Sequence, residues 1–194
     1  MLVAAVVAAS YSWLGRVYAV PSGSMRPTLQ PGDRIVVSRL DRTEVRRGDV
    51  VVVDVGSTWA AAAVPSPRVV VKRVIGLPGE RVTCCDAAGT VSIDGVVLDE
   101  PYAALDPSGS PFDVVVPAGR VWLLGDARAD STDSRHHLGS PGGGSVPVDA
   151  VQGRVVAVVW PPSRFSGVQG GSPAAIGPRR AEPTPMAASA ASGM

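Results

Sequence analysis

The chain has 194 residues and a formal net charge of +1, from 18 basic and 17 acidic residues. This length allows one domain of about 100–200 residues with a small appendage. The balanced charge offers no polybasic face, so we expect no nucleic-acid partner. Two adjacent cysteines and two adjacent histidines are too few for a multi-thiolate zinc site or a histidine-rich metal centre, and we expect no cofactor.

The first feature along the chain is an uncharged run from Leu2 to Leu14, which Arg16 ends. These 13 residues would span about 20 Å as a helix, whereas a hydrocarbon core of about 30 Å takes about 20 residues. We expect residues 1–20 to form an N-terminal transmembrane helix, with translation starting upstream of Met1 and supplying a basic cytoplasmic tail. A cleavable signal peptide is the alternative, although no basic segment precedes the run.

Short β-branched runs follow and predict a mainly β domain at residues 21–165. Asp94-Gly95 lies between two of these runs and is a type I′ hairpin signal. No stretch after residue 20 shows sustained helical periodicity, so we expect coiled antiparallel sheets. The predicted strands, each bounded by Gly, Pro or Asp, are 34–39, 49–55, 69–75, 91–93, 96–98, 114–116, 121–124 and 155–160.

The last segment, residues 166–194, is rich in Gly, Ser, Pro and Ala. Such a composition cannot bury enough apolar surface to fold. We therefore expect a disordered tail, and it contains no second apolar span.

Lys72 stands out because it is the one lysine among 18 basic residues, the other 17 being arginine. Arginine is the default cation in a chain dominated by Ala, Gly, Val, Pro and Arg, as GC-rich coding DNA would give. Arginine stays protonated at any usable pH, whereas a desolvated lysine can lose its proton and act as a base. From composition alone, Lys72 is either such a base or an accidental remnant.

Two other segments contain candidate reactive side chains. In PSGSMRPTL at 21–29, Ser24 lies between Gly and Met shortly before a proline. It is well placed to act as a nucleophile, although a polar linker would look similar. In GDARADSTDSR at 125–135, carboxylates, arginines and hydroxyls are closely spaced.

Together these segments resemble the motifs of bacterial type I signal peptidases, which are membrane-bound Ser/Lys proteases. Five motifs occur in order, namely PSGSMRPTL, GDRIVV, RRGDVVVV, VKRVIGLPGE and GDARADSTDSR, and VQGRVVAVVWPPSR resembles actinobacterial members. The resemblance extends from about Tyr18 to Arg164. It implies the coiled antiparallel sheets of the signal peptidase/LexA-like type.

The resemblance also implies a function. We expect a membrane-anchored serine endopeptidase that removes N-terminal signal peptides from exported preproteins after small-x-small (Ala-x-Ala) sites. Its partners would be these signal peptides and the lipid bilayer, and it would act near the protein-export translocon. It would be a single-pass protein of the cell membrane with its catalytic domain at 21–165 on the extracytoplasmic side.

Residue by residue, Ser24 matches the family's nucleophile and Lys72 its general base. Ser131 matches the serine that hydrogen-bonds to the lysine amine and orients it. The Ser22 hydroxyl with the Ser24 backbone N–H matches the oxyanion hole. The residues that match a supporting polar cluster are Asp126, Asp133 and Arg135. The pockets for small residues at the first and third positions before the cut map onto Tyr18, Val20, Met25, Leu29, Ile35, Val52 and Val71.

The chain departs from the family pattern near Ser131. Ala127 and Ala129-Asp130 stand where the family commonly has Asn and Asp-Asn, and His136-His137-Leu138 replaces an aromatic pair. Because eukaryotic and archaeal signal peptidases use histidine in place of lysine, His136 or His137 is a rival base. We expect these histidines to have a surface or structural role instead.

The region at 81–120, where the family inserts a second β domain, is short and predicts a reduced hairpin cap. Cys84-Cys85 lies in this cap. We expect two small strand residues that point to opposite faces. A vicinal disulfide on the oxidising side of the membrane is the alternative.

Two other functions stay open. A catalytically degenerate homologue would bind signal peptides without cutting them, but it would be expected to lack the serine or the lysine. A LexA-type self-cleaving protease would use the same dyad. That family carries an N-terminal helix-turn-helix, for which this chain has no room.

Overall fold

The computed structural model describes residues 15–39, 44–59, 69–106, 109–168, 170 and 175–176. The apolar run expected to form a membrane anchor, 2–14, lies outside these residues. Within the described ranges, no helix is long and apolar enough to cross a membrane.

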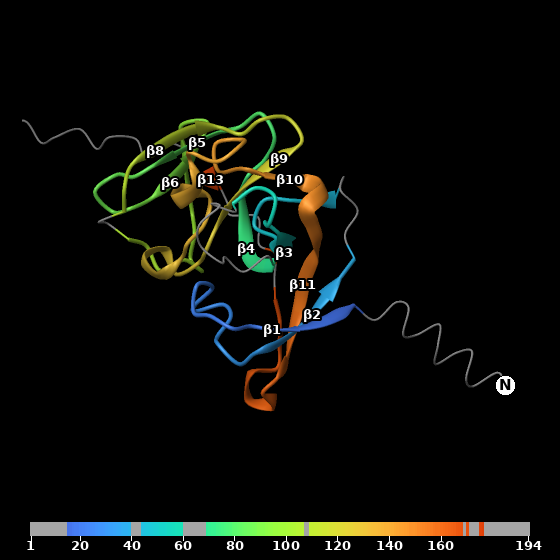
Figure 1. Ribbon diagram of the computed structural model, residues 1–194. Coiled ribbons are helices and arrows are strands. Elements are labelled where there is room, and N and C mark those ends of the chain that lie inside the picture. The colour runs from blue at the N-terminus through green and yellow to red at the C-terminus, as the bar shows by residue number, and fades with distance from the viewer. Residues whose placement is uncertain are drawn as a thin grey trace, which may run out of the picture.

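The larger sheet is antiparallel and contains eight strands in the order β1-β2-β11-β3-β4-β9-β10, with β12 paired to β11. β11 is ten residues long and pairs with both β2 and β3 through bulged registers, which bend and coil a strand. It runs the length of this sheet in Figure 1. The strands are β1 (Arg16–Ala19), β2 (Arg34–Ser38), β3 (Val50–Asp54), β4 (Val69–Gly76), β9 (Arg120–Leu124), β10 (Val146–Pro147), β11 (Val151–Trp160) and β12 (Ser166–Gly167).

The centre of this sheet is buried on both faces. Val50 and Val52 of β3 belong to one hydrophobic cluster, and Val51 and Val53 belong to another on the opposite face. All four side chains are fully buried. A strand covered on both faces has no polar alternation, which explains the continuous valine run in the sequence.

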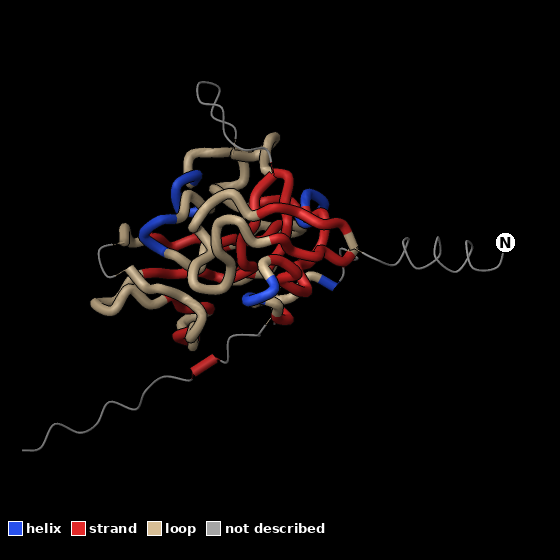
Figure 2. Tube along the Cα trace, turned by 90° about the horizontal axis from the view of Figure 1, so that it is seen from below, coloured by secondary structure: helices blue, strands red, loops and turns tan. Residues whose placement is uncertain are grey.

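A second antiparallel sheet forms the cap, in the order β13-β7-β6-β5-β8. Its hydrophobic cluster includes Ile75 of β4 and Trp122 of β9, so the cap packs against the larger sheet beside those strands. Figure 2 shows the strands of both sheets in red and the short helical turns in blue. The strands of the cap are β5 (Arg81–Cys84), β6 (Val91–Ile93), β7 (Val96–Leu98), β8 (Phe112–Val115) and β13 (Ala175–Ile176).

The mainly β, antiparallel fold predicted from the sequence is confirmed, and every predicted strand overlaps an observed one. The hairpin turn between β6 and β7 is confirmed as well, because Asp94 and Gly95 both have positive φ angles, 49° and 80°. The cap expected as a hairpin at 81–120 contains more than one hairpin. β5 and β8 pair with each other and complete a five-stranded sheet.

Both ends of the expected domain also differ from the sequence-based boundaries. Arg16–Ala19, placed in the anchor, forms β1 and pairs with β2 from Arg16↔Val37 to Ala19↔Arg34. In the tail expected to be disordered, β12 pairs with β11, and β13 pairs with β7. Backbone pairing with open sheet edges orders these short segments without requiring apolar side chains.

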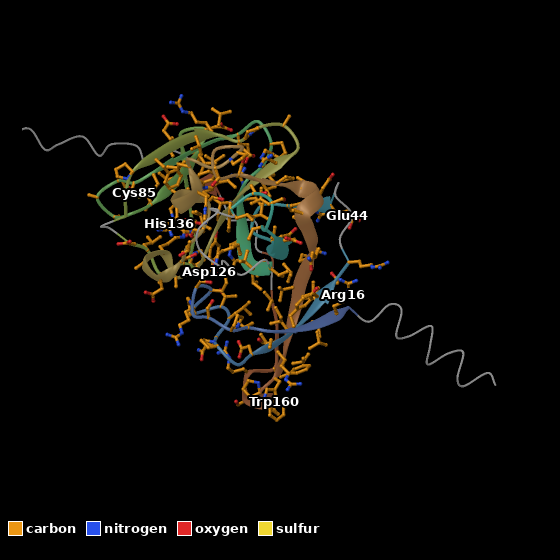
Figure 3. All side chains as sticks on the ribbon, viewed as in Figure 1. Arg16, Glu44, Cys85, Asp126, His136 and Trp160 are labelled. Carbon is orange, nitrogen blue, oxygen red and sulfur yellow. A yellow bond between two sulfur atoms is a disulfide. The ribbon has the colours of Figure 1, made fainter. Side chains whose placement is uncertain are left out.

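The expectation for the cysteines is corrected. Cys84 and Cys85 form a vicinal disulfide rather than pointing to opposite faces of a strand. The disulfide lies where β5 ends, and Cys85 lies in the cap in Figure 3. The alternative interpretation therefore describes this pair.

Candidate active site

Ser24 lies in a tight turn between β1 and β2. The neighbouring Met25 and Leu29 are buried at 1% and 0% exposure and anchor the turn in the hydrophobic core. The Leu29 N–H donates to the Met25 carbonyl at 2.8 Å, and the Ala127 N–H donates to the Ser24 carbonyl at 3.1 Å. The turn is therefore attached to both the core and the segment that follows β9.

Lys72 lies in the middle of β4 and points its amine at this turn. Its Nζ donates a hydrogen bond to Ser24 Oγ at 2.8 Å, and the residue is only 4% exposed. Two residues 48 positions apart in the chain, each singled out from the sequence, are thus in direct contact.

Burial lowers the pKa of Lys72 from 10.5 to about 8. The nearby carboxylates of Asp133 and Asp126 raise this pKa, and the Arg135 guanidinium lowers it, but desolvation is the largest effect. About half of the amines are neutral at pH 8, against less than about one per cent for an ordinary lysine. A neutral amine can accept a proton from the hydroxyl that it contacts.

The other two serines of the predicted site, Ser22 and Ser131, lie near Ser24 but make weaker hydrogen bonds or none with the residues that the structure describes. Ser22 Oγ is 3.4 Å from Ser24 Oγ. Ser131 is 3% exposed, and its Oγ makes no hydrogen bond to any residue in the described ranges. The predicted hydrogen bond between Ser131 and Lys72 is therefore not formed in this structure. Leaving a buried hydroxyl without a hydrogen-bond partner costs about 1–3 kcal/mol of stability. A role in the reaction would explain why Ser131 is kept in this position.

Gly125 allows the Ser131 side chain to lie against the Ser24 turn. A Cβ at Gly125 would overlap Ser131 Oγ and Cβ and would lie 2.5 Å from the Ser24 carbonyl oxygen. Neither the carbonyl nor Ser131 Cβ can move without shifting backbone. Glycine is therefore required here by a close approach.

We expect Gly125→Ala to lower the cleavage rate by at least about tenfold, because it pushes Ser131 and the Ser24 turn apart. Gly139→Ala is the matched control, because a Cβ at Gly139 meets no atom within 4 Å. The rates of both variants are compared with wild type on the same peptide substrate. Equal rates for the two variants would contradict the expectation.

Asp126, the first residue of the predicted polar cluster, forms a buried ion pair with Arg73. Arg73 Nε donates to Asp126 Oδ1 at 2.8 Å, and Nη2 donates to Oδ2 at 2.6 Å. Thr28 Oγ1 donates to Asp126 Oδ2 at 2.5 Å, and Arg73 Nη1 donates to the Gly48 carbonyl at 2.7 Å. Arg73 follows Lys72 on β4, so this pair links that strand to the Ser24 turn.

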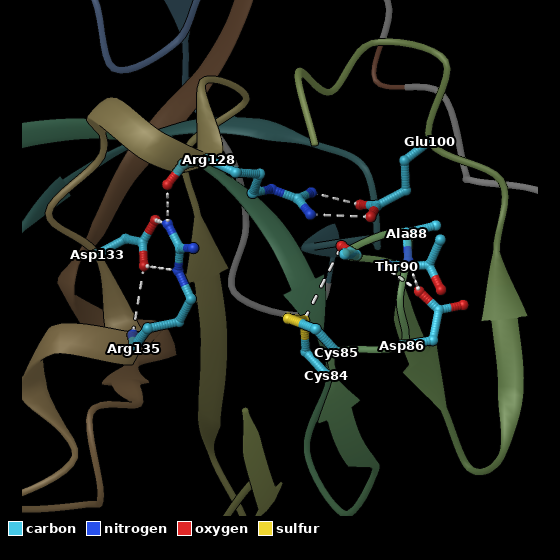
Figure 4. Close-up of a disulfide and its surroundings, with 10 residues drawn as sticks. Cys84, Cys85, Asp86, Ala88, Thr90, Glu100, Arg128, Asp133 and Arg135 are labelled. Carbon is cyan, nitrogen blue, oxygen red and sulfur yellow. Dashed lines mark hydrogen bonds and ion pairs between the residues drawn. A yellow bond between two sulfur atoms is a disulfide. The ribbon is translucent and has the colours of Figure 1, made fainter. Parts of the chain in front are cut away.

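Asp133 and Arg135 form the second half of the cluster (Figure 4). Arg135 Nε and Nη2 donate to the two oxygens of Asp133 at 2.8 and 2.9 Å, and Asp133 Oδ2 also accepts from the Gly125 N–H at 3.0 Å. Although burial opposes ionisation, the neighbouring His136 side chain and the Arg135 guanidinium hold the pKa of Asp133 well below its usual range. Arg135 Nη2 also donates to the Arg128 carbonyl at 2.7 Å.

Sequence reasoning missed Arg73, Arg128, Glu100 and Tyr102. Arg128 forms a second buried ion pair with Glu100, whose segment follows β7 in the cap. The sequence offered one clue, which is that Arg73 lies in the apolar segment VKRV and Arg128 in the motif GDAR. A buried arginine requires a polar or charged partner. The identity of that partner depends on the fold.

The two histidines contact groups other than Ser24. His137 stacks on Trp59 with ring centroids 4.7 Å apart, and burial lowers its pKa. His136 Nδ1 accepts a hydrogen bond from the Asp133 N–H at 3.4 Å. Within the described ranges, no cluster of three or more His, Cys, Asp or Glu side chains could hold a metal ion.

The seven residues expected to line the substrate pockets lie in one hydrophobic cluster. Tyr18 and Val71 are partly buried at its edge, and Tyr18 donates a hydrogen bond to Gln152 Oε1 at 3.0 Å. The other five are 0–4% exposed, so they belong to the hydrophobic core. These five are Val20, Met25, Leu29, Ile35 and Val52.

Comparisons with known proteins agree on one family. Residues 1–160 match the family model described as signal peptidase, peptidase S26. Signal peptidase I of Mycobacterium tuberculosis (strain ATCC 25618 / H37Rv) is 35% identical over 208 residues, which cover 84% of this chain and 70% of that protein. Mitochondrial inner membrane protease subunit 1 of Schizosaccharomyces pombe is 32% identical over 165 residues, covering 82% of each chain. The crystal structure of a signal peptidase I from Enterococcus faecalis V583 is 27% identical, with a TM-score of 0.44, covering 60% of this chain and 98% of that one.

Proposed function

Because this chain belongs to the peptidase S26 family of signal peptidases, we propose that Ser24 and Lys72 form the dyad with which it cleaves peptide bonds. The protein is a serine endopeptidase of the signal peptidase I type, and it removes signal peptides from preproteins. The observation that supports the dyad is the 2.8 Å contact between the buried Lys72 amine and the Ser24 hydroxyl.

The proposed reaction begins when the neutral Lys72 amine takes the proton of Ser24, as in other Ser–Lys enzymes. Ser24 Oγ then attacks the scissile carbonyl carbon, and the Ser24 N–H and the Ser22 hydroxyl stabilise the resulting oxyanion. The Lys72 ammonium returns its proton to the leaving amine. Water then hydrolyses the acyl-enzyme, with Lys72 again acting as the base.

The buried Ser131 hydroxyl is the proposed positioning group for the base. When the Lys72 lone pair is directed at Ser24, an amine N–H is free to donate elsewhere. Ser131 Oγ has unused acceptor capacity, and it lies near the Ser24 turn, since both border the same position at Gly125. A hydrogen bond between them would restrict the amine to the reactive rotamer.

The resemblance of the motifs to the family supports the proposed preference for small residues at the first and third positions before the cut. Met25, Leu29 and Ile35, which map onto the family's pockets, lie in the hydrophobic cluster that also contains Val52 of β3. We further propose that the apolar run from Leu2 to Leu14 is part of a single-span anchor in the cell membrane. The catalytic domain would then lie on the extracytoplasmic side, near the translocon, where signal peptides emerge.

The test is cleavage of a preprotein with one Ala-x-Ala site in detergent micelles, across pH 6 to 10, with the product N-terminus identified by mass spectrometry. One cut after the small-x-small site supports the function. Binding of the preprotein without any cut would instead indicate a degenerate homologue. A cut within this chain itself would indicate a self-cleaving protease.

In this assay the rate should rise through a midpoint near pH 8, because only the neutral form of Lys72 accepts the Ser24 proton. At pH 6, two units below that pKa, the rate should be about one per cent of its alkaline plateau. A midpoint near pH 6.5, the ordinary pKa of histidine, would contradict Lys72 as the base.

A further inference from the structure

The segment from Glu100 to Ala104 leaves the cap after β7 and lies against the active-site segment. The Ala104 N–H donates to the Asp126 carbonyl at 2.8 Å, and the Arg128 N–H donates to the Ala104 carbonyl at 3.1 Å. These bonds form a parallel bridge between Ala104 and Ala127. The cap is therefore joined by backbone hydrogen bonds to the residues immediately before Ser131.

Glu100 extends this connection with a buried ion pair (Figure 4). Its two oxygens accept hydrogen bonds from Arg128 Nη1 and Nη2 at 3.0 and 2.7 Å, and the two side chains are 2% and 3% exposed. Arg128 Nε donates to the Gly125 carbonyl at 3.0 Å. The Glu100 carboxylate thus holds a guanidinium that also bonds to the Gly125 carbonyl, in the segment that leads to Ser131.

Tyr102 connects that ion pair with the one beside Lys72. Its hydroxyl donates to Glu100 Oε1 at 2.8 Å, and its ring lies over the Arg73 guanidinium with Cζ 3.8 Å from the ring centroid. Burial raises the pKa of Tyr102 well above its usual range, so the hydroxyl stays protonated and remains a donor. One side chain from the cap therefore contacts the Arg73 guanidinium directly and is linked to Arg128 through the Glu100 carboxylate.

We propose that Glu100 and Tyr102 are positioning residues for catalysis, which hold Arg128 and Arg73 and thereby the segments that present Ser131 and Lys72. The proposal rests on the proposed Ser24–Lys72 mechanism. It assigns to the cap a role in the reaction, since neither residue contacts the dyad directly.

The expected consequence follows from the charges around Lys72. Burial lowers its pKa, Asp133 and Asp126 raise it, and Arg135 lowers it. The Arg73 guanidinium offsets the negative charge of Asp126. The ring of Tyr102 packs on this guanidinium and holds it in place. Without the ring, Asp126 is less well compensated, and the pKa of Lys72 should rise.

The test compares Tyr102→Leu, Tyr102→Phe and Glu100→Gln with wild type in the full chain, measuring kcat, KM, the pH midpoint and Tm. The first should lower kcat about tenfold, leave KM within about twofold and raise the pH midpoint by at least about 0.3 unit. The phenylalanine variant keeps the ring over Arg73, so its pH midpoint should match wild type while kcat falls less. Glu100→Gln should also lower kcat.

The matched control is Asp113→Asn, which removes an exposed ion pair with Arg81 elsewhere in the cap. All measurements are made below the Tm of each variant, so that loss of folded protein does not lower kcat. The inference is overturned if wild-type kcat and pH midpoint persist in all three variants, or if kcat falls without any shift of midpoint in Tyr102→Leu. If that variant does not fold, wild-type kcat in both Tyr102→Phe and Glu100→Gln overturns it.

A separate variant, Lys72→Ala, distinguishes this inference from the proposed function. If Lys72→Ala is inactive and the Tyr102 and Glu100 variants behave as wild type, only the positioning role fails. If Lys72→Ala cleaves at the wild-type rate, the dyad itself fails.

Discussion

Lys72→Arg should reduce cleavage by at least about 10³-fold, even though it preserves the positive charge. An arginine guanidinium stays protonated throughout the assay range and cannot take the proton of Ser24. Lys72→Met and Ser24→Ala should be inactive to the same extent, because members of a catalytic unit do not contribute additively. The measurement is the initial rate on the Ala-x-Ala preprotein at pH 9.

The methionine variant is the control for packing in this experiment. Met has a similar length to lysine and needs no desolvation of a charge, so Lys72→Met should fold even if the larger guanidinium is not accommodated. Circular dichroism and Tm establish that each variant is folded. A folded Lys72→Arg that cleaves within about tenfold of wild type would exclude Lys72 as the base, and His136 or His137 would be examined next.

The lowered pKa of Lys72 means that the folded protein disfavours the charged form of this amine. A shift from 10.5 to about 8 corresponds to about 3 kcal/mol of disfavoured charge in the folded protein. The packing of the surrounding β sheet offsets that free energy, because β3 and β4 pair along Val50–Asp54 and the four valines of β3 are completely buried. The same packing therefore stabilises the domain and activates the amine.

The sequence was sufficient to single out Ser24 and Lys72, the proposed dyad, and to predict the main sheet. Lys72 is conspicuous because arginine replaces lysine everywhere else, and Ser24 lies in a recognisable motif. In the structure the Lys72 amine donates a hydrogen bond to Ser24, but the expected hydrogen bond of Ser131 to Lys72 is absent. Whether this hydrogen bond forms depends on the rotamer of the Ser131 hydroxyl and on the exact position of the Lys72 amine. The amino-acid sequence specifies neither of these.

The five-stranded sheet of the cap could not be predicted, because its strand order depends on pairing between segments that are distant in the sequence. β5 is four residues long, and β13 contains two residues from a tail with no strand pattern. The partners of Arg73 and Arg128 were missed for the same reason. Asp126 lies 53 residues from Arg73 in sequence, and Glu100 lies 28 residues from Arg128.

Breaking the buried pair between Arg73 and Asp126 should have the largest effect on stability. The two side chains are 2% and 0% exposed, so Arg73→Met leaves a carboxylate in the protein interior with only Thr28 as a polar side-chain partner among the contacts described above. Removing one member of a buried pair typically costs about 3–5 kcal/mol. Urea unfolding monitored by tryptophan fluorescence measures this loss.

The double variant Arg73→Met/Asp126→Leu separates the ion pair from its packing. Replacing both charges with apolar side chains should recover much of the stability lost in Arg73→Met, because no unpaired charge remains buried. Asp113→Asn, in the exposed pair with Arg81, should change stability little. If Arg73→Met is as stable as Asp113→Asn, the pair does not hold β4 against the Ser24 turn. In the expected case, the residual activity of Arg73→Met should have an alkaline-shifted pH midpoint, because the uncompensated Asp126 raises the pKa of Lys72.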